Sequence, residues 1–162
     1  MYYQYLFLEP GSYAKWGNIP LGETQGGIKI TISFQEELLY SQKEGYPIDL
    51  IYKGYEARVS LKTITISKAN LKDIFNLTSN GVFPISTYRN PLAYQLTCSG
   101  SILTGDLIGS YKYLDVTFYK ASILTPGSLL LSRTEEAGLD IEFICLYNTS
   151  QNAIGKFEFT NT

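Results

Sequence analysis

The side chains that most often carry out chemistry in proteins are scarce in this chain of 162 residues. It contains no His, which removes the commonest general base, the commonest zinc ligand and every nucleophile that a His activates. Two carboxylate pairs have the residue type needed for glycoside hydrolysis, Asp106 with Asp115 and Glu135 with Glu136. Acids that are adjacent or lie in loops are usually solvated, so we interpret both pairs as surface charge. The sequence therefore predicts no catalytic residue.

The other signatures of catalysis or cofactor binding are also missing. The chain has no G-x-G-x-x-G or G-x-x-x-x-G-K-[ST] run, and its glycines fall where turns are needed, so no phosphate-binding loop is predicted. Its two cysteines, Cys98 and Cys145, both lie in strand-like runs beside apolar residues. Cysteines in such runs are usually small buried residues in a reducing compartment. We therefore expect no enzyme activity, no metal site and no cofactor.

The composition favours strands joined by glycine turns. Hydrophobic residues make up 44% of the chain and charged residues 17%, with 14 Tyr, 8 Phe and 14 Gly. We expect one domain over residues 1–162, all-β with one short α-helix. The net charge of −2 gives no sign of the basic patch that a dedicated nucleic-acid or anionic-membrane binder carries.

The distribution of apolar residues predicts no membrane partner. The first residues, MYYQYLFLEPG, have no basic segment, and their apolar part is too short and too tyrosine-rich for a signal peptide. No run approaches the ~20 apolar residues of a membrane span. We expect the protein to stay in the cytoplasm where it is made, unless it leaves within a larger assembly.

Residues 26–67 have the pattern of a long β-hairpin. The first arm alternates between apolar and polar side chains with the period of two expected of a half-buried strand. The apolar set, which we expect to face the core, is Ile28, Ile30, Ile32 and Phe34. The polar set is Lys29, Thr31, Ser33 and Gln35.

The second arm, residues 55–66, is less regular. Val59 and Leu61 share one phase, whereas Ile64 and Ile66 share the opposite one. Because an inserted residue changes the face that a side chain takes, this pattern predicts a β-bulge or a sharp twist near Lys62.

The connection between the two arms, residues 35–54, is too long for a tight turn and too apolar for a free linker. Leaving its side chains in water costs about 25 cal/mol per Å² of apolar surface, and contiguous exposed apolar patches mark interfaces. It is expected either to project as a loop towards a partner or to fold back onto its own domain. Its candidate contact residues are Leu38, Leu39, Tyr40, Tyr46, Pro47, Ile48, Leu50, Ile51 and Tyr52.

The remaining segments predict shorter elements. In residues 1–25 we expect an N-terminal strand that stops at Pro10-Gly11, and then an ordered loop, residues 12–27, in which Trp16 is a packing anchor. Leu71, Ile74 and Phe75 have the spacing of one helix face, which predicts a short helix over residues 68–76. Between residues 90 and 160 we expect strands at 92–99, 111–123, 128–132, 139–147 and 156–159.

The order of these elements resembles the tail tube proteins of long-tailed bacteriophages. In that family a glycine-led strand enters a long loop with a Pro-Ile or Pro-Val-Asp segment, then returns through a Gly-containing turn to a second strand and a short Leu-rich helix. The counterparts here are Gly27–Ile30, Tyr46–Asp49, Lys53–Val59 and Ala69–Phe75, and the runs Leu114–Ala121 and Gly138–Phe143 look like the closing strands. Type VI secretion tube proteins, contractile tail tubes and tail-completion proteins have a similar architecture.

The resemblance implies a sandwich or barrel-like domain whose copies form rings, hexameric in the family, that stack into a hollow DNA conduit. It implies assembly in the host cytoplasm, a final location in the virion tail, and other tail proteins at the tube ends. The two hairpin arms would join a barrel shared by all subunits, which removes exposed strand edges, and the connection would stack one ring on the next. DNA would pass transiently and without sequence preference along lumen-facing candidates Lys29, Thr31, Ser33, Gln35, Ser60 and Lys62.

A different class of function stays open beside this one. An aromatic-rich β-sandwich can act as a monomeric binding module for carbohydrate or a protein ligand, and the 14 tyrosines leave room for exposed aromatic platforms. Most tyrosines in such a domain lie in the core or at interfaces, where an apolar ring with a polar tip is favoured.

Overall fold

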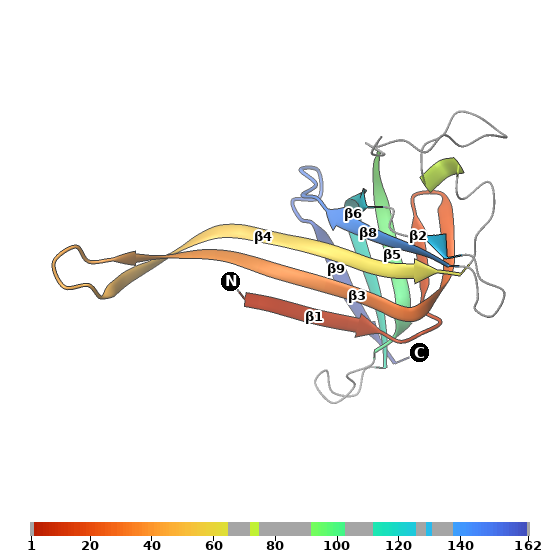
Figure 1. The fold of residues 1–162 in the computed structure, drawn as a ribbon, viewed down its shortest axis with the longest axis horizontal. Coiled ribbons are helices and arrows are strands. Elements are labelled where there is room, and N and C mark those ends of the chain that lie inside the picture. The colour runs from red at the N-terminus through yellow and green to blue at the C-terminus, as the bar shows by residue number, and fades with distance from the viewer. Residues whose placement is uncertain are drawn as a thin grey trace.

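A computed structural model describes residues 2–64, 72–74, 92–102, 112–125, 129–130 and 138–161, most of which lie in β-strands. Figure 1 shows β1 (Tyr2–Leu8), β2 (Tyr13–Trp16), β3 (Ile19–Tyr40), β4 (Pro47–Thr63), β5 (Ala93–Ser101), β6 (Tyr113–Thr125), β7 (Leu129–Leu130), β8 (Gly138–Cys145) and β9 (Gly155–Thr160). Residues 72–74 form one helical turn, and the rest of the expected helix 68–76 lies outside the described residues. The all-β class with a short helix is confirmed.

The strands form one antiparallel sheet that closes on itself. Its order is β7-β8-β4-β3-β2-β5-β6-β9, with β1 paired to β3. Because β6 also pairs with β8, the strands β8, β4, β3, β2, β5 and β6 make a ring. In Figure 1, β1, β3, β4 and β8 run as one layer, and β5, β6 and β9 cross behind it. The core lies between these two layers.

Trp16 stands at the centre of that core. It is fully buried, and its indole Nε1–H donates a 2.8 Å hydrogen bond to the carbonyl oxygen of Ala121. Its ring centroid lies 5.0 Å from that of Tyr94 and 5.7 Å from that of Phe143. These contacts join β2 to β5, β6 and β8, which confirms the predicted packing role of Trp16.

The prediction of a loop over residues 12–27 is wrong, because this segment contains β2 and the first part of β3. In β2 the exposed Tyr13 and Lys15 alternate with the buried Ala14 and Trp16. The alternation covers only four residues and ends at Gly17, whose φ of 61° makes the turn into β3. A strand this short between glycines gives too few periods to recognise in the sequence.

The prediction that residues 35–54 form a loop is also wrong, because most of them lie in β3 and β4. β3 and β4 stay paired from Thr24–Thr63 out to Tyr40–Pro47, and only the turn at residues 41–46 interrupts them. Register shifts after Gln35 and after Leu39 break the period of two. The sequence therefore shows no regular alternation where these strands lie. At its N-terminal end the paired hairpin begins at Thr24, before the predicted start at residue 26.

The β-bulge predicted near Lys62 of the second arm lies opposite it, in the first arm, and Ile66, which contributed to the predicted reversal, lies outside the described residues. The buried positions of β4 alternate without a break to its end at Thr63. Gly26 and Gly27 are inserted in β3 between the residues that pair with Lys62 and Leu61. Two inserted residues leave the faces of β3 and β4 matched, so β4 needs no reversal.

Replacing Gly27 by Ala is expected to destabilise the fold more than replacing Gly26 by Ala. The two glycines have φ angles of 82° and 76°, so either variant bears the strain of an L-residue in the left-handed region, about 1–2 kcal/mol. A Cβ on Gly27 would also overlap the carbonyl oxygen of Leu8, whereas one on Gly26 meets no atom within 4 Å. Urea unfolding should show an extra loss of at least about 1 kcal/mol for G27A. Equal losses would contradict the close approach of β1.

Candidate assembly surface

The hairpin extends well beyond the rest of the fold, and residues 35–54 of it are called the ribbon. β1 pairs with β3 as far as Phe34, and β8 pairs with β4 from Ala57 onward. Past these points β3 and β4 pair only with each other within the described strands, and Figure 1 shows them projecting from the body. The ribbon therefore lacks the neighbouring strands or second layer that normally stabilise a hairpin. An isolated two-stranded hairpin is only marginally stable in water.

Cross-strand pairing places the ribbon side chains on two faces, since paired residues point to the same side. Leu38 pairs with Leu50, and the Phe34 ring lies 6.4 Å from Tyr52 and 6.2 Å from Tyr55, centroid to centroid. This face continues the core side of β3 and β4 outward. Its large side chains, here called the apolar stripe, are Phe34, Leu38, Tyr40, Leu50, Tyr52 and Tyr55.

The apolar set of the first arm faces the core side as expected, and Ile32 packs against the core, but Phe34 lies beyond it. Ile28 and Ile30 are buried, but Ile32 and Phe34 are only half-buried. The crossing layer of β5, β6 and β9 covers the base of the hairpin and does not follow β3 outward (Figure 1). The side chain alternation continues, but the second layer that would bury it ends.

The predicted contact residues of the connection are all exposed, yet they do not form one surface. Leu39 and Ile51 lie on the face opposite the apolar stripe. Tyr46, Pro47 and Ile48 lie at the end of the ribbon, next to the turn. The remaining candidates, Leu38, Tyr40, Leu50 and Tyr52, belong to the apolar stripe.

The predicted lumen-facing residues do share one side of the sheet. This side, opposite the core, is called the polar face, and β8 adds side chains to it through its pairing with β4. The sequence patterns missed the β8 residues because nothing in them indicates which strands pair. The polar face comprises Lys29, Thr31, Ser33, Gln35, Glu56, Arg58, Ser60, Lys62, Asp140 and Glu142.

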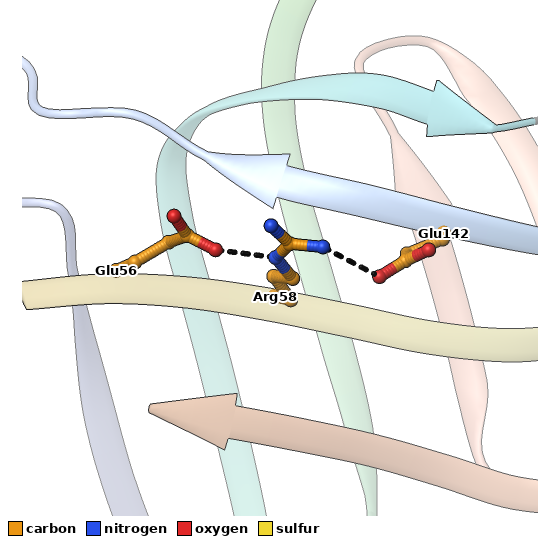
Figure 2. Close-up of polar contacts among 3 residues, drawn as sticks. All are labelled: Glu56, Arg58 and Glu142. Carbon is orange, nitrogen blue, oxygen red and sulfur yellow. Dashed lines mark hydrogen bonds and ion pairs between the residues drawn. The ribbon is translucent and has the colours of Figure 1, made fainter. Parts of the chain in front are cut away.

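Arg58 lies between two carboxylates on the polar face (Figure 2). Its Nε–H donates to Glu56 on the same strand, and its Nη1–H donates to Oε1 of Glu142 at 3.4 Å. The hydrogen bond that Arg58 donates to Glu56, supported by the one to Glu142, raises the pKa of Arg58 above its ordinary value. The Arg58 side chain is 43% exposed, so water screens these ion pairs and they add little stability.

Cys98 and Cys145 are both buried free thiols, as the sequence predicts. Burial raises the pKa of Cys98 from 9.0 to about 12, and burial together with the nearby Cys98 raises the pKa of Cys145. A thiol that stays protonated is a poor nucleophile and a poor metal ligand.

The two thiols are expected to resist alkylation by iodoacetamide at pH 8.5 until the protein unfolds, as mass spectrometry can show. The unfolded thiols ionise near pH 9.0, whereas the folded Cys98 thiol keeps its proton up to about pH 12. The raised pKa of Cys98 therefore makes its full contribution to the free energy of unfolding below pH 9, and that contribution is lost as the pH rises towards 12. Rapid labelling of the folded protein would contradict the buried position.

The carboxylate pairs considered from the sequence do not form a described site. Asp115 is exposed on β6, and its possible partner Asp106, like Glu135 and Glu136, lies outside the described residues. Within the described ranges, no group of three or more His, Cys, Asp or Glu side chains could hold a metal ion. The helical part of those ranges contains no segment long and apolar enough to cross a membrane.

Fold and surface together define an all-β protein with a closed antiparallel sheet and a projecting amphipathic ribbon. Comparison with protein-family models and with curated proteins finds no match to this chain.

Proposed function

We propose that this protein is a structural subunit that assembles through its ribbon into stacked rings, which form a hollow tube of the kind that conducts DNA in phage tails. The observation that carries the proposal is the apolar stripe, which lies on a projecting element and is left uncovered by its own chain. Leu38 is 47%, Leu50 50% and Tyr40 57% exposed. Apolar side chains gathered on one side of an extended element are typical of an interface.

A second copy of the same chain is the partner proposed for the ribbon. Within the described strands, β1 and β9 each pair with one neighbour in the sheet. Edge strands of this kind are available for side-by-side association of subunits. Copies arranged in this way would form the rings, and the ribbon of one ring would lie against the next.

The polar face supports a passage on the inner side of such a ring. It extends over β3, β4 and β8 and carries hydroxyl, amide and charged groups of both signs. A lining without excess positive charge suits DNA transit, because basic groups bind the phosphate backbone. We further propose hexameric rings, assembly in the host cytoplasm, a place in the virion tail and other tail proteins at the tube ends, by the resemblance to tail tube proteins.

Negative-stain electron microscopy and sedimentation velocity over a range of protein concentrations test this function. Rings or hollow filaments that appear above a threshold concentration are the expected result. A protein that stays monomeric at the highest concentrations and binds glycans saturably would overturn the proposal in favour of a carbohydrate-binding module.

A further inference from the structure

The charges of the polar face are arranged as neighbours of opposite sign. Arg58 contacts Glu56 and Glu142, and Lys62 pairs in register with Asp140 across β4 and β8. On the ribbon side of this face, Lys53 forms an ion pair with Glu37. Arg58, Lys62 and Lys53 therefore each lie beside a carboxylate.

Arg58 differs from the lysines because two carboxylates hold it at once (Figure 2). All three side chains are between 31% and 43% exposed, and ion pairs exposed to this degree contribute little to stability. The second carboxylate is therefore not explained by folding. Its main effect is electrostatic, since one guanidinium and two carboxylates leave a local charge of −1.

Arginine is the side chain best suited to bind phosphate, because its planar fork donates two parallel hydrogen bonds to two oxygens. In this structure Nε–H and one Nη–H of Arg58 already donate to Glu56 and Glu142. A phosphate that accepts from the Nε–H must displace the Glu56 carboxylate, and one that accepts from the remaining Nη1–H and Nη2–H groups must approach the Glu142 carboxylate. The two glutamates thus oppose phosphate binding by geometry and by charge.

We propose that Glu56 and Glu142 are positioning residues that keep Arg58 from binding the phosphate groups of a nucleic-acid backbone. A nucleic acid can then pass along the polar face without being retained by it. The biological reason for this arrangement, the passage of DNA, rests on the proposed function. The withholding itself is a property of the single subunit and can be measured without assembly.

The test is the binding of a fluorescent 20-base-pair DNA duplex to dilute subunits, followed by anisotropy at several salt concentrations. Glu56→Gln with Glu142→Gln should bind about tenfold or more tightly than the wild type at low salt. The slope of log K against log salt should steepen by about 0.9 for each phosphate newly contacted. Adding Arg58→Gln to this double variant should return both quantities to the wild-type values.

A matched control separates this effect from the change in net charge. Glu44→Gln with Asp115→Asn removes the same two negative charges from exposed positions in the ribbon turn and on β6, away from the polar face, and it should bind DNA as weakly as the wild type. The inference is overturned if E56Q/E142Q binds no more tightly than this control, or if the Arg58→Gln triple variant still binds. The E56Q single variant, which should be intermediate, gives a second readout if the double variant unfolds. Absence of tubes in the microscope bears on the proposed function alone, because anisotropy uses unassembled subunits.

Discussion

Replacing Leu38 and Leu50 together by glutamine is expected to abolish tube formation at concentrations where the wild type assembles, while the domain stays folded. The two leucines face each other across the ribbon and are 47% and 50% exposed. Complete burial of a leucine is worth about 1.5–3 kcal/mol, so burying the exposed half of each contributes about 2 kcal/mol per subunit in total. Losing that contribution should raise the critical concentration for assembly about thirtyfold.

The matched control for this variant changes the other face of the same ribbon. Leu39→Gln with Ile51→Gln replaces two apolar side chains of similar exposure that lie opposite the apolar stripe, and it should assemble close to the wild-type threshold. Sedimentation velocity gives the threshold, and thermal unfolding by circular dichroism checks the fold. Tubes formed by L38Q/L50Q at the wild-type threshold would show that the stripe is not the contact surface.

Replacing Trp16 by alanine is expected to give the largest loss of stability in the molecule. The variant removes a fully buried ring from between β5, β6 and β8 and leaves a cavity, which costs about 3–5 kcal/mol. A typical domain has about 5–15 kcal/mol in all. For a chain of this length the melting temperature should fall by about 6–20 °C, measured by far-ultraviolet circular dichroism.

Trp16→Phe separates the packing of this residue from its hydrogen bond. Phenylalanine fills most of the space but leaves the carbonyl oxygen of Ala121 without the indole donor, a loss of about 1–3 kcal/mol. The expected order of stability is wild type, W16F, W16A. If W16A were as stable as W16F, the ring contacts with Tyr94 and Phe143 would not be the main stabilising interactions.

Several strands could be predicted from the sequence because their side chains alternate over enough residues. Leu96 and Cys98 in β5, and Leu114 and Val116 in β6, are buried at alternate positions within the strands predicted at 92–99 and 111–123. β2 is the counterexample: it has four residues between glycine-rich turns, which is too short for a period to be recognised. Its place in the sheet depends on its pairing with β3, which follows directly after a turn, and with β5, which is distant in the sequence.

The candidate surfaces were predicted in part for the same reason. The polar set of the first arm, from Lys29 to Gln35, lies on one side as its period of two requires. The ribbon residues were recognised as apolar side chains without a place in the core, but their division into two faces was not. That division depends on register shifts after Gln35 and Leu39, which depend on how β3 and β4 pair.

By itself, the sequence determined the strand-rich class, the long hairpin, the alternation of its first arm and the buried character of Trp16 and the two cysteines. These follow from local periodicity and from the type of each side chain, which act over a few residues. Only the tertiary structure decided that β8 lies beside β4 and brings Glu142 to Arg58, 84 positions away. It also decided that the layer behind the hairpin ends before the ribbon does, because strand pairing and layer packing join segments whose separation in the sequence carries no periodic signal.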